Sequence, residues 1–332
     1  MATYAPGNGN LHMSRSGKTD EFYTQISLIE KELRYYKDFF KGKTVFCNCD
    51  DPVESNFWKY FELNFEQLGL KKLIATHYET EKPSYKLELM KDENEDGKVK
   101  NALDIVRTPL RQNGDFRSPE CVEIMQSADV IVTNPPFSLF REYIAQLMSY
   151  GKQFLIIGNQ NAVTYREILP LLMDNKVWLG YNSGHFWFRV PDDYEEKKTD
   201  FKIDENGVKW RRMGNICWFT NIDIEKRHEN MTLFRNYTPE KYPKYDGYDA
   251  IEVSKTADIP CDYYGIMGVP ITFMDKYNPA QFEILGLDDH RIPWLGHGPS
   301  LNGKTLYRRL IIRRKGHNDE NNNAESRDTI EN

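Results

Sequence analysis

Residues 128–140 read ADVIVTNPPFSLF, and this stretch decides the predicted fold. Its first part, residues 129–133, has the composition of a buried strand, and a helical pattern begins at residue 138. Four residues stand between the two elements: Asn134, Pro135, Pro136 and Phe137. An amide, two rigid prolines and an aromatic ring at the end of a buried strand are more than a turn requires.

The segments around this stretch alternate between strand and helix. Apolar strands are expected at 43–52, 71–78, 129–133 and 153–159. Helical patterns cover 20–40, 55–69, 118–128, 138–151 and 164–175, and residues 85–106 indicate a hairpin that turns at Asp96-Gly97. Apolar strands that alternate with helices are typical of a parallel sheet covered on both faces. We therefore predict an α/β fold with a Rossmann-like, doubly wound, mostly parallel sheet.

The sequence changes character after residue 180. Short aromatic runs separated by turns replace the alternation, which predicts a mixed, loop- and strand-rich C-terminal region. The predicted division is a flexible leader (1–17), a first domain (18–190), a second region (191–317) and a disordered acidic tail (318–332).

Composition excludes several classes of protein. The net charge is −6, but Lys and Arg cluster at 209–213 and 307–315, so the total does not exclude a nucleic-acid partner. The five cysteines and seven histidines show no ligand spacing, which argues against a disulfide framework and against any metal site. Because no secretory signal or apolar run of 18 residues is found, we expect a cytoplasmic protein without a membrane partner.

The tetrapeptide at 134–137 has the chemistry to hold an –NH₂ group. The side-chain oxygen of Asn134 and the carbonyl of Pro135 are acceptors, and the prolines supply no competing donors. Phe137 offers an apolar face to a flat base. An exocyclic aromatic amine is a poor nucleophile, so acceptors that hold its hydrogens as the nitrogen pyramidalises stabilise the transition state. Methyl transfer from a sulfonium then requires alignment and no metal.

Two more strand ends carry polar residues. Ligands of an open parallel sheet bind outside the carboxyl ends of its strands. The segment CNCDDP (47–52) ends the first strand and lacks the glycines of G-x-G-x-x-G, which argues against a dinucleotide dehydrogenase. In GDF (114–116), Asp115 could accept the amine of an adenine, with Phe116 beside the ring.

Each of these motifs has a plainer structural explanation. Asn-Pro-Pro also terminates strands as a simple turn, and Asp115 alone would be an ordinary loop residue. Each basic cluster could be an exposed face. Residues 184–190 (GHFWFRV) could supply an aromatic wall, yet burial of Phe186 and Phe188 in a core explains them as well.

Seven segments closely resemble the EcoRI-type adenine-specific DNA methyltransferases over nearly the whole chain. They are DEFYTQ (20–25), VFCNCDDPVESNFWKYF (45–61), GDFRS (114–118), VTNPPFSLFREY (132–143), KQFLIIGN (152–159), MGVPITF (267–273) and LNGK (301–304). The resemblance implies S-adenosyl-L-methionine as cofactor and double-stranded DNA as partner, with methylation of N6 of a flipped adenine. It also implies a restriction-modification or phage/mobile-element system and, by analogy, a monomer.

The resemblance also assigns residues. Those near the methionine part of the cofactor would be Asp20, Phe22, Tyr23 and Thr24. The first cofactor-binding turn would be Asn48, Cys49 and Asp50, and the cofactor adenine would lie between Asp115 and Phe116. The catalytic loop would be Asn134, Pro135, Pro136 and Phe137, in a motif order similar to the gamma arrangement. The acid that often binds the ribose is missing from 74–81, so that ligand stays unassigned.

Residues 191–317 then become a DNA recognition region. In this context the basic clusters predict phosphate contacts. The residues concerned are Lys209, Arg211, Arg212, Arg308, Arg309, Arg313 and Arg314.

Other functions stay open at this point. The same acceptor loop could serve a methyltransferase of cytosine N4, of a guanine in RNA or of a glutamine amide in a protein. A non-catalytic DNA-binding relative is a third class.

Overall fold

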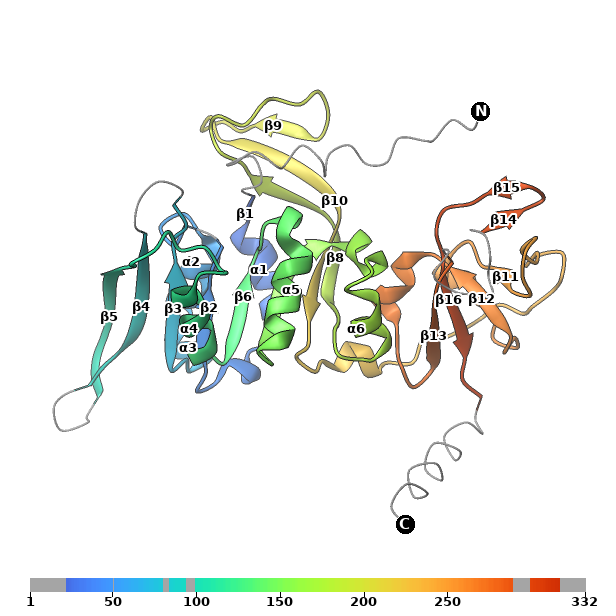
Figure 1. The fold of residues 1–332 in the computed structure, drawn as a ribbon, viewed down its shortest axis with the longest axis horizontal. Helices are drawn as coiled ribbons and strands as arrows, with labels where there is room; N and C mark the ends of the chain where they lie inside the picture. Colours follow the sequence, from blue (N-terminus) through green and yellow to red (C-terminus); the bar gives the residue numbers. More distant parts are fainter. Residues whose placement is uncertain (1–21, 50, 80–83, 94–98, 289–298, 317–332) are drawn as a thin grey trace, which may run out of the picture. The chain divides into compact units, whose positions relative to one another are not determined.

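The computed structural model describes residues 22–49, 51–79, 84–93, 99–288 and 299–316 (Figure 1). The predicted leader and tail, Asp20, Asp50 and the turn at Asp96-Gly97 lie outside the described residues. The chain forms two compact units: unit 1 contains residues 1–160 and 179–222, and unit 2 contains residues 161–178 and 223–332. The predicted functional boundary at residue 190 stays a prediction. None of the described helices is long and apolar enough to cross a membrane.

Unit 1 is built on a ten-stranded sheet with a parallel centre. The parallel strands lie in the order β3-β2-β6-β7. Their bounds are Lys72–Thr76 (β3), Thr44–Cys47 (β2), Val130–Thr133 (β6) and Gln153–Asn159 (β7). Nearly all of their residues are buried, as the continuous apolar runs predicted for strands covered on both faces.

Antiparallel strands extend this centre on both sides. At one edge β4 (Tyr85–Glu93) pairs with β3 and with β5 (Val99–Pro109), which confirms the predicted hairpin. On the other side β10 (Lys209–Thr220) pairs with β7. The remaining strands on that side are β8 (Trp178–Arg189), β1 (Tyr23–Thr24) and β9 (Phe201–Ile203), which pairs with β10.

The sheet is therefore mixed and only partly parallel. The predicted parallel strands form its centre, but the prediction did not include the antiparallel strands on either side. Strands β8 and β10 each have 12 residues, whereas the sequence suggested only short strands there. Antiparallel neighbours need no helical crossover, so the alternation of strand and helix could not reveal these strands.

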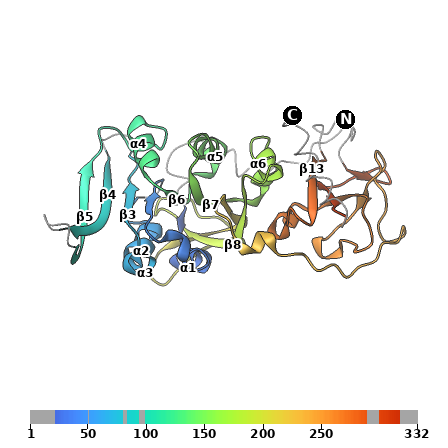
Figure 2. The ribbon, with the colours of Figure 1, turned by 90° about the horizontal axis from the view of Figure 1, so that it is seen from below.

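Helices cover both faces of the parallel centre (Figure 2). One face carries α1 (Ile26–Leu33), α2 (Asn56–Leu63) and α3 (Phe65–Leu68), and the opposite face carries α4 (Pro119–Ser127) and α5 (Phe140–Ser149). Helix α4 starts as predicted, because the Ser118 hydroxyl accepts the N–H of Cys121 and Pro119 occupies the first turn. Short 3-10 helices lie at Asp38–Phe40 (η2), Phe137–Leu139 (η3) and Gln160–Thr164 (η4).

Unit 2 contains a smaller sheet in the order β11-β12-β16-β13. These strands are Ile251–Glu252, Ile266–Val269, Leu310–Arg314 and Phe282–Leu287. A separate hairpin pairs β14 (Ser300–Leu301) with β15 (Lys304–Thr305). The helices are α6 (Leu169–Met173), η5 (Glu225–His228), η6 (Thr256–Asp258) and η7 (Ile271–Lys276). Phe273, Phe282, Ile311 and Ile312 are fully buried and form the core of this strand- and loop-rich unit.

Candidate active site

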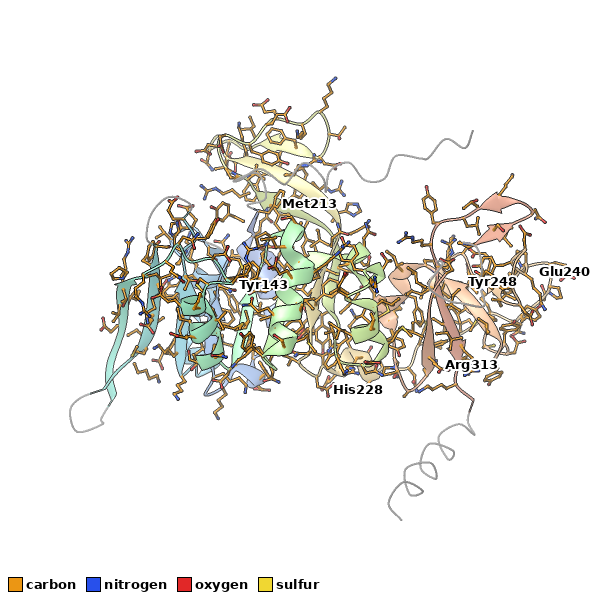
Figure 3. All side chains as sticks on the ribbon, in the orientation of Figure 1. Tyr143, Met213, His228, Glu240, Tyr248 and Arg313 are labelled. Atoms are coloured by element: carbon orange, nitrogen blue, oxygen red, sulfur yellow. The ribbon has the colours of Figure 1, made fainter. Side chains whose placement is uncertain are left out.

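The predicted first cofactor turn and the predicted catalytic loop meet at the carboxyl ends of β2 and β6. Thr133 donates its hydroxyl to the carbonyl of Asn48, and Tyr143 of α5, labelled in Figure 3, donates its hydroxyl to the Asn48 side-chain oxygen. The chain moves from β2 to β3 in one direction along the sheet and from β6 to β7 in the other. The sheet order therefore reverses between β2 and β6, where open sheets bind ligands.

Asn134 presents an unpaired acceptor at this edge. Its side chain is 6% exposed, and its Nδ2 donates to the carbonyl of Phe22 across 2.6 Å. That bond leaves Oδ1 as a buried oxygen with no hydrogen-bond partner in the described part of the chain. An unsatisfied buried polar atom costs about 1–3 kcal/mol. A donor from a bound ligand would remove this cost.

The prolines of the loop shape the backbone that follows. The N–H of Leu139 donates to the carbonyl of Pro136 across 3.0 Å, which closes the turn of η3. The carbonyl of Pro136 is thus used internally. The role of the Pro135 carbonyl as second acceptor stays a prediction.

Phe137 belongs to an aromatic cluster. Its ring stacks against that of Phe22 at 5.9 Å between centroids with 20° between the planes. Phe188 meets the Phe137 ring edge-on at 6.4 Å. Phe186 and Phe188 are both buried, which confirms their interpretation as core residues. Phe188 nonetheless contacts Phe137 of the predicted catalytic loop. The same side chain therefore packs in the core and supports the predicted site.

The N-terminal strand β1 brings the next predicted residues to the same place. Tyr23 pairs with Arg189 and Thr24 with Phe188. The hydroxyl of Thr24 is a second buried oxygen without a hydrogen-bond partner among the described residues. The predicted site therefore contains two buried polar atoms, Thr24 Oγ1 and Asn134 Oδ1, that have no hydrogen-bond partner among the described residues.

Cys49 adopts a left-handed backbone conformation, with φ of 75°. Such a conformation is uncommon outside glycine and lets the chain turn sharply after β2. Burial, with the nearby Cys49 thiol as the next contribution, raises the pKa of Tyr143 well above its usual 10. Tyr143 therefore stays protonated and keeps Asn48 in place.

The GDF segment is held against the end of β3. Gly114 has φ of 81°, and a Cβ at this position would lie 1.9 Å from the carbonyl oxygen of His77. The Asp115 carboxylate accepts from Arg117 at 2.9 Å (Nε) and 2.6 Å (Nη2), and these side-chain bonds lower its pKa. Phe116 is 7% exposed and meets the ring of Tyr143 edge-on at 5.0 Å. An ionised carboxylate beside a ring fits an adenine amine.

Sequence reasoning did not foresee that the polar residues after β2 and β3 meet Tyr85 of β4 in one cluster. Asp51 accepts the hydroxyl of Tyr85 at 3.0 Å and lies 3.7 Å from Nε2 of His77. The His77 and Tyr85 rings stack at 5.0 Å. An acid therefore stands at the end of β3, contributed by the loop that follows the neighbouring strand β2. Thr76 of β3 pairs with Lys86 of β4, and this register places Tyr85 beside His77.

One basic cluster lies on the catalytic edge of unit 1. Ile216 of β10 pairs with Asn159, the last residue of β7, so residues 209–215 extend beyond the carboxyl end of β7 (Figure 1). Lys209 donates to the carbonyl of Tyr194 at 3.1 Å. Arg211 donates to the carbonyl of Asp200 at 3.1 Å, and Arg212 lies 3.6 Å from the Asp200 carboxylate.

The other basic cluster belongs to unit 2. Some of its arginine side chains are bound to other residues of the chain, and one is exposed. Arg309 is part of a buried ion pair with Glu252 at 2.7 Å. Arg313 pairs with Glu283 at 2.7 Å, and Arg314 donates to the carbonyl of Cys261. Arg308 is exposed. The structure thus places the two predicted clusters in different units.

The chain matches one protein family over most of its length. The family described as "Adenine-specific methyltransferase EcoRI" matches residues 10–331. The chain is 46% identical to the type II methyltransferase M.EcoRI of Escherichia coli over 323 residues, which cover 93% of the chain and 97% of that relative. It is 36% identical to M.MpnI of Mycoplasma pneumoniae over 321 residues, covering 91% and 97%. It is 37% identical to M.MgeORF184P of Mycoplasma genitalium over 326 residues, covering 92% and 99%.

Proposed function

The chain belongs to the EcoRI family of adenine-specific methyltransferases, and from this premise we propose that it methylates N6 of adenine within a specific duplex DNA site. Its setting would be a type II restriction-modification system, as for its relatives. The observation that carries the proposal is the buried, unpaired Oδ1 of Asn134 in the N-P-P-F loop.

The residues at the sheet edge fit S-adenosyl-L-methionine, which supplies a methyl group on a sulfonium when bound. Asp115 and Phe116 would hold its adenine, and the turn at Asn48 and Cys49 would border it. Thr24 offers an unpaired hydroxyl for its methionine part. The reversal of strand order between β2 and β6 supports a Rossmann-like arrangement for the unit.

Catalysis would rest on holding the adenine amine. Phe22 fixes the Asn134 amide so that Oδ1, and not Nδ2, meets the incoming –NH₂ group. Oδ1 and the Pro135 carbonyl would each accept one N6 hydrogen and draw the nitrogen lone pair out of conjugation. The adenine must first leave the duplex, at a cost of a few kcal/mol. Phe137, backed by Phe22 and Phe188, would receive its ring.

A labelling experiment tests the reaction. We expect unmethylated plasmid incubated with the protein and methyl-labelled S-adenosyl-L-methionine to yield labelled N6-methyladenine. Label in N4-methylcytosine, or label confined to RNA or protein, would overturn the proposal in favour of another amine substrate. DNA binding without any label would indicate a non-catalytic relative.

Two variants separate the contribution of the Asn134 side chain from that of the Phe22 ring. Asn134→Ala should lower the single-turnover rate by about 10²–10³-fold, the loss typical of one preorganised hydrogen-bonding group, and leave cofactor affinity near wild type. Phe22→Leu keeps the main-chain carbonyl that orients the amide, so its rate should fall by about tenfold or less, the smaller effect of lost ring packing. Equal losses in both variants would contradict the role given to the carbonyl.

The state of the protein in solution and in the cell follows from the same proposal. One asymmetric chain that carries both the catalytic loop and the basic surfaces would act on DNA as a monomer. A DNA substrate would also agree with the expected cytoplasmic location.

A further inference from the structure

The hairpin β14–β15 and the three residues after it, which we name the 300–308 element, project from the sheet of unit 2 (Figure 1). Tyr307 at its end is 88% exposed, the largest value among the exposed large apolar side chains described. Lys304 and Arg308 on either side are also exposed. Among the described residues, none forms a hydrogen bond, ion pair or ring contact with these three side chains.

The backbone of this element is held rigidly at its tip. The carboxylate of Asp246 accepts the N–H groups of Asn302 and Gly303, both at 2.9 Å. The N–H of Asp246 donates in return to the carbonyl of Ser300 at 3.0 Å. The Asp246 carboxylate therefore accepts hydrogen bonds from the turn amides and forms no ion pair with Lys304 or Arg308.

The base of the element is anchored by a buried ion pair. Arg309 donates to both Glu252 oxygens, and the side chains of this pair are 13% and 4% exposed. Its Nη1 also donates to the carbonyl of Tyr307 at 3.2 Å. Arg309, two residues after Tyr307, thus turns inward and fixes the main chain from which Tyr307 projects.

Among the described residues, no contact of these three side chains stabilises the fold. An exposed ring gains no burial energy, and two unpaired cations beside it gain no ion pair. A fixed backbone lowers the entropy that a side chain loses when a partner orders it. The element is therefore preorganised for a ligand that is anionic and also offers flat apolar surfaces. A DNA duplex presents phosphates at its surface, and it presents base faces where an inserted side chain opens a base step or where the target base has left the stack.

We propose that the 300–308 element binds duplex DNA, with Tyr307 packed against a base and Lys304 and Arg308 on neighbouring phosphates. This inference rests on the proposed function for the identity of the nucleic acid. It adds a contact surface in unit 2 that is separate from the catalytic loop of unit 1, and it makes Arg309 a positioning residue in place of a phosphate contact.

The test compares two kinds of variant in the full-length protein by fluorescence anisotropy on a duplex that the wild type methylates. Lys304→Ala/Arg308→Ala should reduce the slope of log K against log salt by about 2, one for each lost phosphate contact. Tyr307→Ala should weaken binding about tenfold with the slope unchanged, because stacking carries no counterion release. Tyr307→Phe should bind like the wild type.

Matched controls come from the opposite edge of unit 1. Tyr150 is 42% exposed at the end of α5, and Lys37 and Lys41 are exposed before β2. Tyr150→Ala and Lys37→Ala/Lys41→Ala should leave affinity and salt slope unchanged. Unfolding midpoints should match the wild type throughout, and the single-turnover rate should be unchanged in the two control variants.

Two different failures can be told apart. Binding by Tyr307→Ala and by Lys304→Ala/Arg308→Ala within twofold of the wild type, while the wild type methylates DNA, would overturn this inference alone. A wild type that binds DNA through the 300–308 element but transfers no methyl group would overturn the proposed function alone.

Discussion

The oxygen of Asn134 is available to a ligand because the carbonyl of Phe22 takes the other end of the amide. Without that acceptor the side chain could rotate and present an N–H group, which would repel the hydrogens of an amine. The two residues are 112 positions apart in the chain. A main-chain group thus decides which atom of the Asn134 side chain stays unpaired.

Asp115 gives a pH dependence with a defined sign. Its pKa lies below the ordinary 3.8, first through the Arg117 side-chain bonds. A depressed carboxyl pKa stabilises the fold above the unfolded value and loses that contribution as pH falls through the folded value. Removing Arg117 removes the depression, so the stability gap between wild type and Arg117→Ala should be largest near pH 6 and shrink below about pH 4.

Urea unfolding at a series of pH values measures this gap. A gap that stays constant from pH 6 to pH 3.5 would contradict the assignment of the effect to Asp115. Arg111→Ala is a suitable control, because its guanidinium is 82% exposed and lies 3.7 Å from Glu120.

Residue-level prediction from sequence succeeded where the chemistry is local. The residue types at 134–137 show directly that this tetrapeptide offers acceptors and an aromatic ring. Because it follows a parallel strand, as Asn48 and Cys49 do, their position at one edge of the sheet could be anticipated. The carbonyl of Phe22, the hydroxyl of Tyr143 and the cluster of Asp51, His77 and Tyr85 could not. Each is a long-range contact made by a residue type that carries no distinctive local pattern.

At the scale of elements, the turn after β5 depends on one glycine. Gly114 combines φ of 81° with a close approach to the end of β3. The segment that bears Asp115 and Phe116 can therefore lie against His77 only without a side chain at residue 114. The position of the candidate cofactor site is set by this contact between two chain segments.

A pair of alanine substitutions separates strain from contact. Gly42 also has positive φ, 73°, but no atom lies within 4 Å of a Cβ built there. Gly42→Ala should cost about 1–2 kcal/mol of folding free energy, the strain of the left-handed conformation alone. Gly114→Ala should cost more, because the His77 carbonyl must also move.

The same pair distinguishes an effect on the site. Cofactor affinity, measured by calorimetry, should fall in Gly114→Ala and stay at the wild-type value in Gly42→Ala. Equal affinity in both variants would show that residues 114–116 do not border the cofactor.

Element-level prediction failed mainly for β8 and β10. Both are long, yet their sequences lack the alternation with helices that marked β2, β3, β6 and β7. Helix α6 lies within the helical pattern predicted for residues 164–175, and it belongs to unit 2 with β13. No local signal in 161–178 shows that the chain leaves unit 1 there and returns at residue 179.

At the scale of the whole molecule, basic side chains gather on two surfaces although the net charge of the chain is negative. The net charge is −6, yet Lys304 and Arg308 stand exposed in unit 2 and Lys209, Arg211 and Arg212 extend from the catalytic edge of unit 1. Only charges within about 8 Å of a phosphate interact strongly at physiological ionic strength. Under the proposed function, these surfaces and not the net charge of the chain would govern binding to DNA.

Salt titration tests this distribution. Each phosphate neutralised contributes about −0.9 to the slope of log K against log salt, so several contacts should weaken DNA binding more than tenfold between 50 and 200 mM salt. Affinity for S-adenosyl-L-methionine, a small ligand held by packing and hydrogen bonds, should change far less over that range. If DNA affinity proved as insensitive to salt as cofactor affinity, the basic residues of both units would lose their assigned role, and recognition would have to rest on uncharged contacts alone.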